Sequence, residues 1–188
     1  LNDKDIFMFE KQTYHAGTYS EAGIAAIWTE KPEAAGSGAY YASLFAEAGR
    51  VSGLSPYFIA ARAALESGSG TSRLAKGEVE GSEGYYNFYG IGAVDTDPAA
   101  GGALAKKYGW DSRRKAIIEG AVWIRDQYVS VLQYTPYFIK YSFVPERGWH
   151  QYMTDIAAPY KDGGMLCAAH RAGGTYDSEI EFVIPVFD

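Results

Sequence analysis

The sequence contains little cysteine and little histidine. Cys167 is the single cysteine among 188 residues, so no disulfide can form within the chain and the fold must depend on packing. The three histidines, His15, His150 and His170, are far apart and make no recognisable metal-ligand spacing with Cys167. We therefore expect neither a metal ion nor any other cofactor.

Long apolar runs and clusters of basic residues are also missing. No stretch approaches the length of about 18 apolar residues that a membrane-spanning helix needs. The formal net charge is −6 and there is no basic run, which argues against binding of nucleic acid through its phosphates. Residues 1–10 lack the basic start and apolar middle of a signal peptide, so we interpret the chain as a mature or excised domain.

Hydrophobic and aromatic residues are abundant. Hydrophobic residues make up 47% of the chain, which is enough for one well-formed core and predicts a single domain. The 16 Tyr, 9 Phe and 4 Trp exceed what a small helical core normally needs. Tyr and Trp combine an apolar face with a polar edge, so such rings suit a groove that binds carbohydrate.

Loop-forming residues fill positions 30–38, and helical spacing begins after them. We expect residues 1–38 to form an N-terminal extension packed on a catalytic domain of residues 39–188. The first predicted helix covers 39–49, with Gly49 as its stop. The second covers 57–66: Ser55 and Pro56 provide the cap and first-turn proline that begin a helix, and Ser67-Gly68 end it.

Further elements follow in the second half of the chain. Residues 85–93 predict a short β-hairpin or looped lobe, and a capped helix is expected from about 113 to 129. A last helix should start near Thr154 and Asp155 but be interrupted at 162–164, before a β-type run at 180–187. The predicted fold class is mainly α with a small β component (α+β).

Glu66 is the most notable carboxylate because it stands at the C-terminal end of a strongly capped helix. The negative end of the helix dipole favours its protonated form by about 0.3–1 kcal/mol. A general acid that works near neutral pH needs a larger effect, a pKa rise of about two units from about 4.3. We therefore expect neighbouring aromatic rings to desolvate Glu66, because a hydrophobic pocket raises the pKa of a carboxylic acid and keeps it protonated.

The stretch Ala64-Leu65-Glu66-Ser67-Gly68 and its neighbours resemble, in the same order, the peptidoglycan N-acetylglucosaminidases of glycoside hydrolase family 73. The similar blocks are 53–75, 85–93, 109–110, 116–124, 150–156 and 182–186. The resemblance implies a lysozyme-like fold with a small β-hairpin lobe. It also implies an endo-β-N-acetylglucosaminidase that hydrolyses the GlcNAc-β-1,4-MurNAc linkage of peptidoglycan in cell-wall remodelling, cell separation or autolysis.

The resemblance also implies roles for individual residues. Glu66 matches the catalytic glutamate, which protonates the glycosidic oxygen. Tyr152 matches a tyrosine beside the cleavage site, where a phenol stabilises positive charge or positions water. The residues expected to bind substrate are Tyr86, Asn87, Phe88 and Gln151.

Glycosidases commonly need a second carboxylate, and the sequence leaves this one open. The loop carboxylates that could fold over the groove are Glu78, Glu80, Glu83, Asp95 and Asp97. We rank Glu83 and Asp95 first. The alternative is that the acetamido group of the substrate acts as the nucleophile.

Three other functions compete with this hypothesis. A lytic transglycosylase or a muramidase would use the same fold to cut after MurNAc, and fold alone does not separate them. A non-catalytic glycan-binding domain would keep the aromatic residues without needing Glu66. We expect a secreted, cell-wall-associated monomer whose partner is the peptidoglycan glycan strand.

Overall fold

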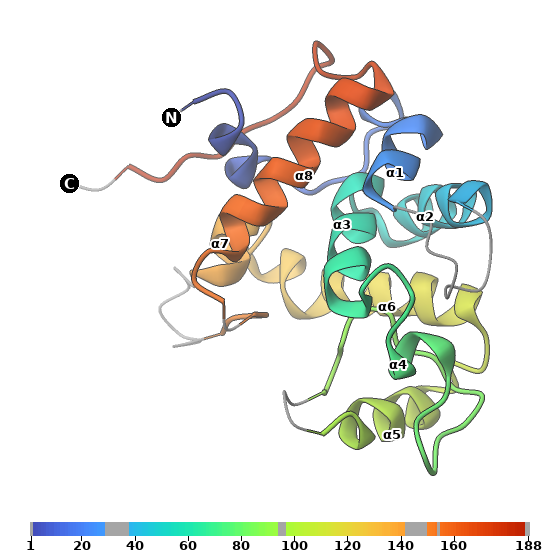
Figure 1. Ribbon diagram of the computed structural model, residues 1–188. Coiled ribbons are helices and arrows are strands. Elements are labelled where there is room, and N and C mark those ends of the chain that lie inside the picture. Colours follow the sequence, from blue (N-terminus) through green and yellow to red (C-terminus); the bar gives the residue numbers. More distant parts are fainter. Residues whose placement is uncertain (1, 29–37, 94–96, 142–149, 154, 187–188) are drawn as a thin grey trace.

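The computed structural model describes residues 2–28, 38–93, 97–141, 150–153 and 155–186, which form a mainly helical fold (Figure 1). Its α-helices are α1 (Glu21–Ile27), α2 (Gly38–Ser52), α3 (Pro56–Ser67), α4 (Arg73–Lys76), α5 (Ala99–Tyr108), α6 (Arg113–Gln127), α7 (Pro136–Lys140) and α8 (Ala158–Gly173). Short 3-10 helices are η1 (Asp5–Phe9), η2 (Ala16–Thr18) and η3 (Val129–Val131).

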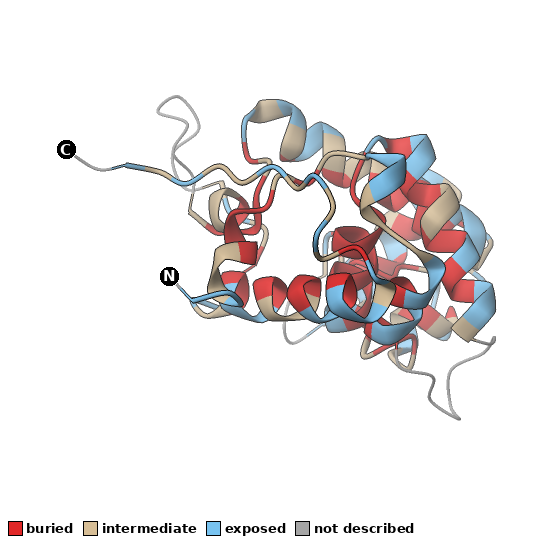
Figure 2. Cartoon of the chain, turned by 90° about the horizontal axis from the view of Figure 1, so that it is seen from above, coloured by how far each residue is buried: buried red, intermediate tan, exposed pale blue. Residues whose placement is uncertain are grey.

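Helix α3 is the centre of the fold. Ten of its twelve residues are buried, and α1, α2 and α8 pack against it. The outer helices are amphipathic, and Figure 2 shows their turns alternating between buried and exposed residues. Because α3 is covered on several sides, its C-terminal end is held in a fixed place. This is the end that carries Glu66.

The predicted boundaries of α3 and α6 are confirmed within two residues. The Ser55 hydroxyl accepts a hydrogen bond from the Phe58 amide, Pro56 occupies the first turn, and Gly68 ends the helix in the left-handed conformation with φ 58°. Ser112 caps α6 in the same way by accepting from the Lys115 amide. Local capping chemistry therefore determines where these helices start and stop.

Helix α2 continues past Gly49, so the predicted stop at that residue is wrong. A Cβ at position 49 would stand 2.6 Å from Cγ of Pro56 and 2.9 Å from the Leu54 carbonyl oxygen. Gly49 thus allows the start of α3 to approach α2 closely. The chain turns instead at Gly53, which has φ 76°.

The predicted β-hairpin lobe at 85–93 is not confirmed, because these residues form successive turns and no strand. The Tyr86 amide donates to the Trp110 carbonyl and the Asn87 amide donates to the Leu74 carbonyl, so the backbone is bonded to the α5–α6 connection and to α4 instead of to a partner strand. The described part of the run 180–187 forms one isolated bridge, between Phe182 and Glu10.

Helix α8 is continuous from Ala158 to Gly173, so the predicted interruption at 162–164 is wrong. The helix begins three residues after Asp155, later than predicted, and Thr154 lies outside the described residues. A Cβ at Gly163 would stand 2.7 Å from the Met8 backbone nitrogen, and a Cβ at Gly164 would stand 2.6 Å from Cε of Lys4. The two glycines let η1 pack directly on α8. Tertiary contact outweighs their low helix propensity.

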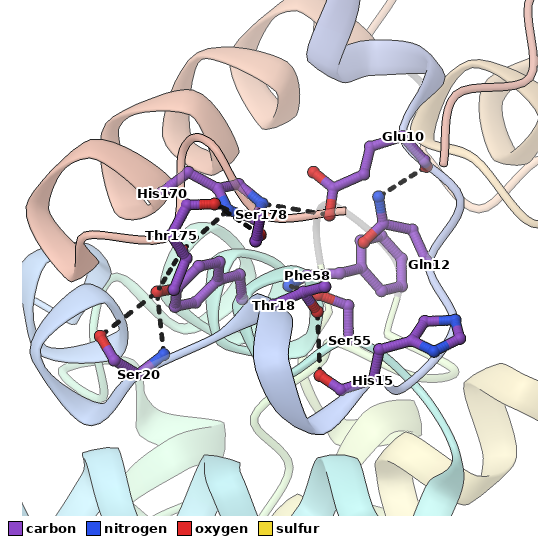
Figure 3. Close-up of polar contacts among 11 residues, drawn as sticks. Glu10, Gln12, His15, Thr18, Ser20, Ser55, Phe58, His170, Thr175 and Ser178 are labelled. Atoms are coloured by element: carbon purple, nitrogen blue, oxygen red, sulfur yellow. Dashed lines mark hydrogen bonds and ion pairs between the residues drawn. The ribbon is translucent and has the colours of Figure 1, made fainter. Parts of the chain in front are cut away.

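A buried polar cluster joins the N-terminal segment to α8 and the turn that follows it (Figure 3). His170 lies 3.3 Å from Oε1 of Glu10 through Nε2 and 2.9 Å from the Thr175 hydroxyl through Nδ1. Tyr57, near the start of α3, contacts Thr175 at 3.2 Å through its hydroxyl. The cluster fixes the N-terminal end of α3, opposite to the end that carries Glu66.

None of the helices that the structure describes is long and apolar enough to cross a membrane.

Candidate active site

A cavity of about 520 Å³ opens at the C-terminal end of α3. This volume lies within the range of about 300–1,000 Å³ that is usual for ligand sites. Its walls come from α3, α4, the loop 89–93, the end of α6, the start of α8, and Tyr152, Met153 and Asp155. The polar and aromatic lining residues that matter below are Arg62, Glu66, Trp123, Tyr128, Tyr152, Asp155 and Lys161.

Glu66 reaches this cavity because α3 ends directly after it. The helix closes at Ser67 and the chain turns away at Gly68, so no further helical turn covers the Glu66 side chain, which is 31% exposed. Arg62 lies one helical turn earlier, with Nη2 3.5 Å from Oε1 of Glu66. The carboxyl group is therefore accessible from the cavity and is fixed on one side by a cation.

Gly90 fixes the other side of Glu66. Its φ is 64°, a left-handed conformation that favours glycine, and a Cβ there would stand 3.1 Å from Oε2 of Glu66. A side chain at this position would therefore push the Glu66 carboxylate away by a few tenths of an ångström. This gives a physical reason for a glycine at position 90.

Asn87 fixes the conformation of that loop through hydrogen bonds. Its side-chain amide donates to the carbonyl oxygens of Ile91 at 2.8 Å and Gly101 at 3.2 Å, and its Oδ1 accepts from the amides of Tyr89 and Ile91. Asn87 is 1% exposed. Its contribution to the site is to position the loop around Gly90, and it does not line the cavity as the substrate-binding prediction required.

Tyr152 forms the wall beside Glu66. The Arg62 guanidinium lies over its ring at 5.6 Å, and its hydroxyl donates to the Tyr89 carbonyl oxygen. Burial raises the pKa of Tyr152 well above its usual value, and the negative charge of Glu66 raises it further. The phenol therefore stays protonated with its proton directed to the backbone, which leaves the lone pairs of its oxygen as acceptors.

Asp155 is a second carboxylate on the cavity wall, and it was not among the predicted bases. Lys161 of α8 lies 2.5 Å from its Oδ2. The hydrogen bond from Lys161 and one from the Ala157 amide hold the pKa of Asp155 below its usual range, so it is ionised. Its place three residues after Tyr152, within the block 150–156, was the signal that could have identified it.

Several predicted site residues lie elsewhere. Glu83 is exposed, and backbone amides, its own and that of Gly81, lower its pKa; it is not on the cavity wall. Tyr86 stacks under the Arg113 guanidinium at 5.1 Å, and Gln151 is exposed and accepts from Lys140. Asp95 lies outside the described residues.

Phe88 is also a structural residue. It is fully buried and packs against Trp28 and Tyr41, with ring centroids at 6.1 and 6.0 Å. Of the eight predicted catalytic and substrate-binding residues, the structure brings Glu66 and Tyr152 together on the cavity wall. Within the described ranges, no three His, Cys, Asp or Glu side chains converge in a way that would hold a metal ion.

Comparison with known proteins agrees with the resemblance seen in the sequence. Residues 42–177 match the glucosaminidase family model, described as mannosyl-glycoprotein endo-β-N-acetylglucosaminidase. The chain is 38% identical over 121 residues to the bifunctional autolysin of Staphylococcus aureus strain MSSA476, which covers 60% of this chain and 10% of the autolysin. It thus spans about a tenth of the length of that curated relative.

Two solved structures share the fold. The crystal structure of S. aureus glucosaminidase B is 31% identical, with a TM-score of 0.70 over 91% of this chain and 67% of that chain. A catalytic mutant of S. aureus autolysin E, with alanine in place of a glutamate, was solved in complex with the disaccharide NAG-NAM. It is 29% identical, with a TM-score of 0.68 over 95% of this chain and 78% of that chain.

Proposed function

The chain belongs to the glucosaminidase family, and on that premise we propose that it is an endo-β-N-acetylglucosaminidase that hydrolyses the GlcNAc-β-1,4-MurNAc linkage of peptidoglycan. The observation that carries the proposal is the position of Glu66, at the open end of a buried helix and on the wall of the cavity. The autolysin E structure supports the same assignment, because its catalytic mutant replaces a glutamate and holds the disaccharide NAG-NAM.

Glu66 is the general acid. It donates its proton to the glycosidic oxygen while the bond between that oxygen and the anomeric carbon of N-acetylglucosamine breaks. The Arg62 guanidinium, 3.5 Å away, then stabilises the carboxylate that remains on Glu66. Positive charge develops on the sugar ring at the same time, and the carboxylate of Glu66 and the oxygen of Tyr152 are the acceptors that face it.

The attack on the anomeric carbon needs a second group. Among the described residues, the carboxylates on the cavity wall are Glu66 and Asp155, and Asp155 is engaged by Lys161. Asp95 therefore stays our prediction for a base supplied by the protein. The acetamido group of the substrate is the alternative nucleophile, and it would need no second carboxylate.

We propose that residues 1–38 are an extension packed on the catalytic domain of residues 39–188, and that the fold is lysozyme-like. The contacts of η1 and α1 with α8 support the first part. We also propose that the protein is a secreted monomer that acts on the cell wall in remodelling, cell separation or autolysis. The similarity to a bifunctional autolysin supports action on the cell wall.

The decisive experiment is mass spectrometry of the reduced products after purified peptidoglycan is incubated with the wild type or with Glu66→Gln. We expect reducing-end N-acetylglucosamine from the wild type and a rate at least about 100-fold lower from the variant, because the glutamine amide has no acidic proton to transfer. The matched control is Glu47→Gln. Glu47 is also 31% exposed and paired with an arginine, Arg114, but it lies on α2 outside the cavity.

Other outcomes would assign a different function. Products that end in muramic acid or anhydro-muramic acid would identify a muramidase or a lytic transglycosylase. Full activity of Glu66→Gln would remove Glu66 from its role as the acid. Binding of glycan strands by the wild type without any cleavage would indicate a glycan-binding domain.

A further inference from the structure

Arg62 is a buried cation between two carboxylates, and one of them has no part in the proposed reaction. Its Nη2 lies 3.5 Å from Oε1 of Glu66, and its Nη1 lies 3.3 Å from Oδ2 of Asp162. The Arg62 side chain is 3% exposed and that of Asp162 is 0% exposed. The three side chains form a line of alternating charge from the interior of the molecule to the cavity.

Asp162 is poorly explained as a stabilising residue. Among the described residues, neither of its carboxyl oxygens accepts a hydrogen bond. Burial raises the pKa of Asp162, and the charge of Arg62 opposes that rise. The desolvation of a buried ion pair commonly exceeds the Coulombic gain, so an apolar pair in place of Arg62 and Asp162 would stabilise the fold as well or better. The carboxylate at this position therefore points to a role in the site.

The architecture of α8 directs Asp162 toward α3. Asp162 is the fifth residue of the helix, and the next residue, Gly163, packs on the backbone of η1 at Phe7 and Met8. This close contact sets the rotation of α8, because a side chain at position 163 would push the helix away. Asp162 then reaches Arg62 one turn before Glu66 on α3.

We propose that Asp162 is a positioning residue that holds Arg62 and balances its charge, so that Glu66 keeps the proton it donates to the substrate. This inference rests on the proposed function, in which Glu66 is the general acid. A guanidinium close to a carboxyl group favours the ionised form, which has no proton to give. A second carboxylate on the far side of the guanidinium opposes that effect, and Arg62 still stabilises Glu66 after the proton has left.

Other ionisable groups also surround Glu66 and Arg62. Those that line the cavity with them are Tyr89, Tyr128, Tyr152, Asp155 and Lys161. The first three are phenols, and burial raises the pKa of each. Asp155 and Lys161 neutralise one another as an exposed ion pair. The charge of Asp162 is therefore the buried one available to balance Arg62 within this described set.

The size of the effect follows from Coulomb's law. With the guanidinium between them, the carboxyl groups of Asp162 and Glu66 are on the order of 8 Å apart. At an effective dielectric constant of about 20, removal of one charge at that distance shifts the titration of the other group by about one to two pH units. A shift of this size is easily measured.

The test compares Asp162→Asn with the wild type by two measurements. The first is a ¹³C NMR titration of the Glu66 carboxyl carbon, assigned by the signal that disappears in Glu66→Gln. The second is the pH profile of kcat on purified glycan strands. In Asp162→Asn we expect the Glu66 titration and the basic limb of the profile to move about one unit to lower pH. We also expect kcat at neutral pH to fall about tenfold and KM to change little.

Two further variants separate this role from a merely structural one. In Arg62→Gln/Asp162→Asn both charges are absent, so no unpaired charge is buried. Arg62 is closer to Glu66 than Asp162 is, so its loss outweighs that of Asp162 and the Glu66 titration should move about one unit above that of the wild type. The control Glu10→Gln removes another buried carboxylate that contacts α8 at His170. His170 is about 12 Å further along that helix than Asp162, so neither the titration nor the profile should move.

An unchanged Glu66 titration in Asp162→Asn would overturn the proposal, as would a double variant that behaves like the single one. The NMR titration does not depend on turnover. If the wild type failed to cleave peptidoglycan, or if Glu66→Gln stayed active, the proposed function would fail while the titration still decided whether Asp162 acts on Glu66.

Discussion

Gly90→Ala is expected to impair catalysis by displacing Glu66. A methyl group at this position would stand 3.1 Å from Oε2, 3.7 Å from Cβ and 3.8 Å from Cδ of Glu66. Ordinary van der Waals contacts of a Cβ begin at 3.4 Å, so the carboxyl group must retreat by a few tenths of an ångström. The backbone is also strained, because φ at this residue is 64°.

Gly90→Ala should lower both the stability and the catalytic rate. The left-handed conformation costs an alanine about 1–2 kcal/mol, which lowers Tm by about 2–8 °C in a domain of this size. A misplacement of about 1 Å costs up to about 100-fold in rate, so a few tenths of an ångström should lower kcat about three- to tenfold. The loss of activity should therefore appear at temperatures well below the transition, where the variant is fully folded.

Gly84→Ala is the matched control. Gly84 has φ 79° and would have nothing within 4 Å of an added Cβ, so the substitution introduces similar backbone strain without touching Glu66. We expect the two variants to lose similar amounts of Tm in calorimetry, and kcat to fall in Gly90→Ala alone. The assay is the initial rate of release of reducing ends from peptidoglycan.

The role given to Gly90 would be refuted by equal kcat values in Gly90→Ala and the wild type. It would also be refuted if Gly84→Ala lost as much kcat as Gly90→Ala. In the first case Glu66 would not depend on the close approach of the loop, and in the second the activity loss would come from strain alone.

Tyr152→Phe removes the hydroxyl that donates to the Tyr89 carbonyl and that we expect to face the sugar. Steady-state kinetics should show kcat about tenfold lower, with KM changed less than about twofold. An unchanged kcat would mean that the ring alone matters. Asn87→Ala removes the hydrogen bonds to Ile91, Gly101 and Tyr89. In urea denaturation it should lower the free energy of unfolding by about 2–4 kcal/mol, and a loss below about 0.5 kcal/mol would contradict the role given to Asn87. Burial raises the pKa of Glu10 above 4.5, so the folded state binds this proton more tightly than the unfolded state; the stabilising contribution is complete below pH 4.5 and is lost as pH rises through the folded value. Glu10→Gln should therefore flatten the decline of unfolding free energy above pH 4.5, whereas an unchanged slope would assign the decline to another group.

Local chemistry made α3 and its end predictable. The cap at Ser55, the proline at 56 and the glycine at 68 act within one helical turn, so their effect does not depend on the rest of the chain. They place Glu66 at a helix terminus, where a carboxylate is open to solvent on one side. The family resemblance adds the chemical meaning of that position, and the match over residues 42–177 confirms the family.

Glycines were the main source of wrong boundaries. Gly49, Gly163 and Gly164 lie inside helices because another backbone or side chain occupies the space that a Cβ would need. Helix α5 contains Gly101 and Gly102, and at position 102 a Cβ would stand 2.2 Å from the Ser82 hydroxyl oxygen. The sequence pattern cannot distinguish a glycine that ends a helix from one that lets two elements pack closely.

The sequence by itself determined the helical core, the helix that ends at Glu66, and the identity of Glu66 and Tyr152 as the residues to examine. Only the tertiary structure decided which groups surround them. Asp162 reaches Arg62 from a helix 100 residues further along the chain, and Asp155 and Lys161 line the cavity from the same region. Asn87 and Phe88, in contrast, turned out to support the site from inside. Long-range contacts of this kind depend on how helices pack against one another, and neither capping nor periodicity encodes that arrangement.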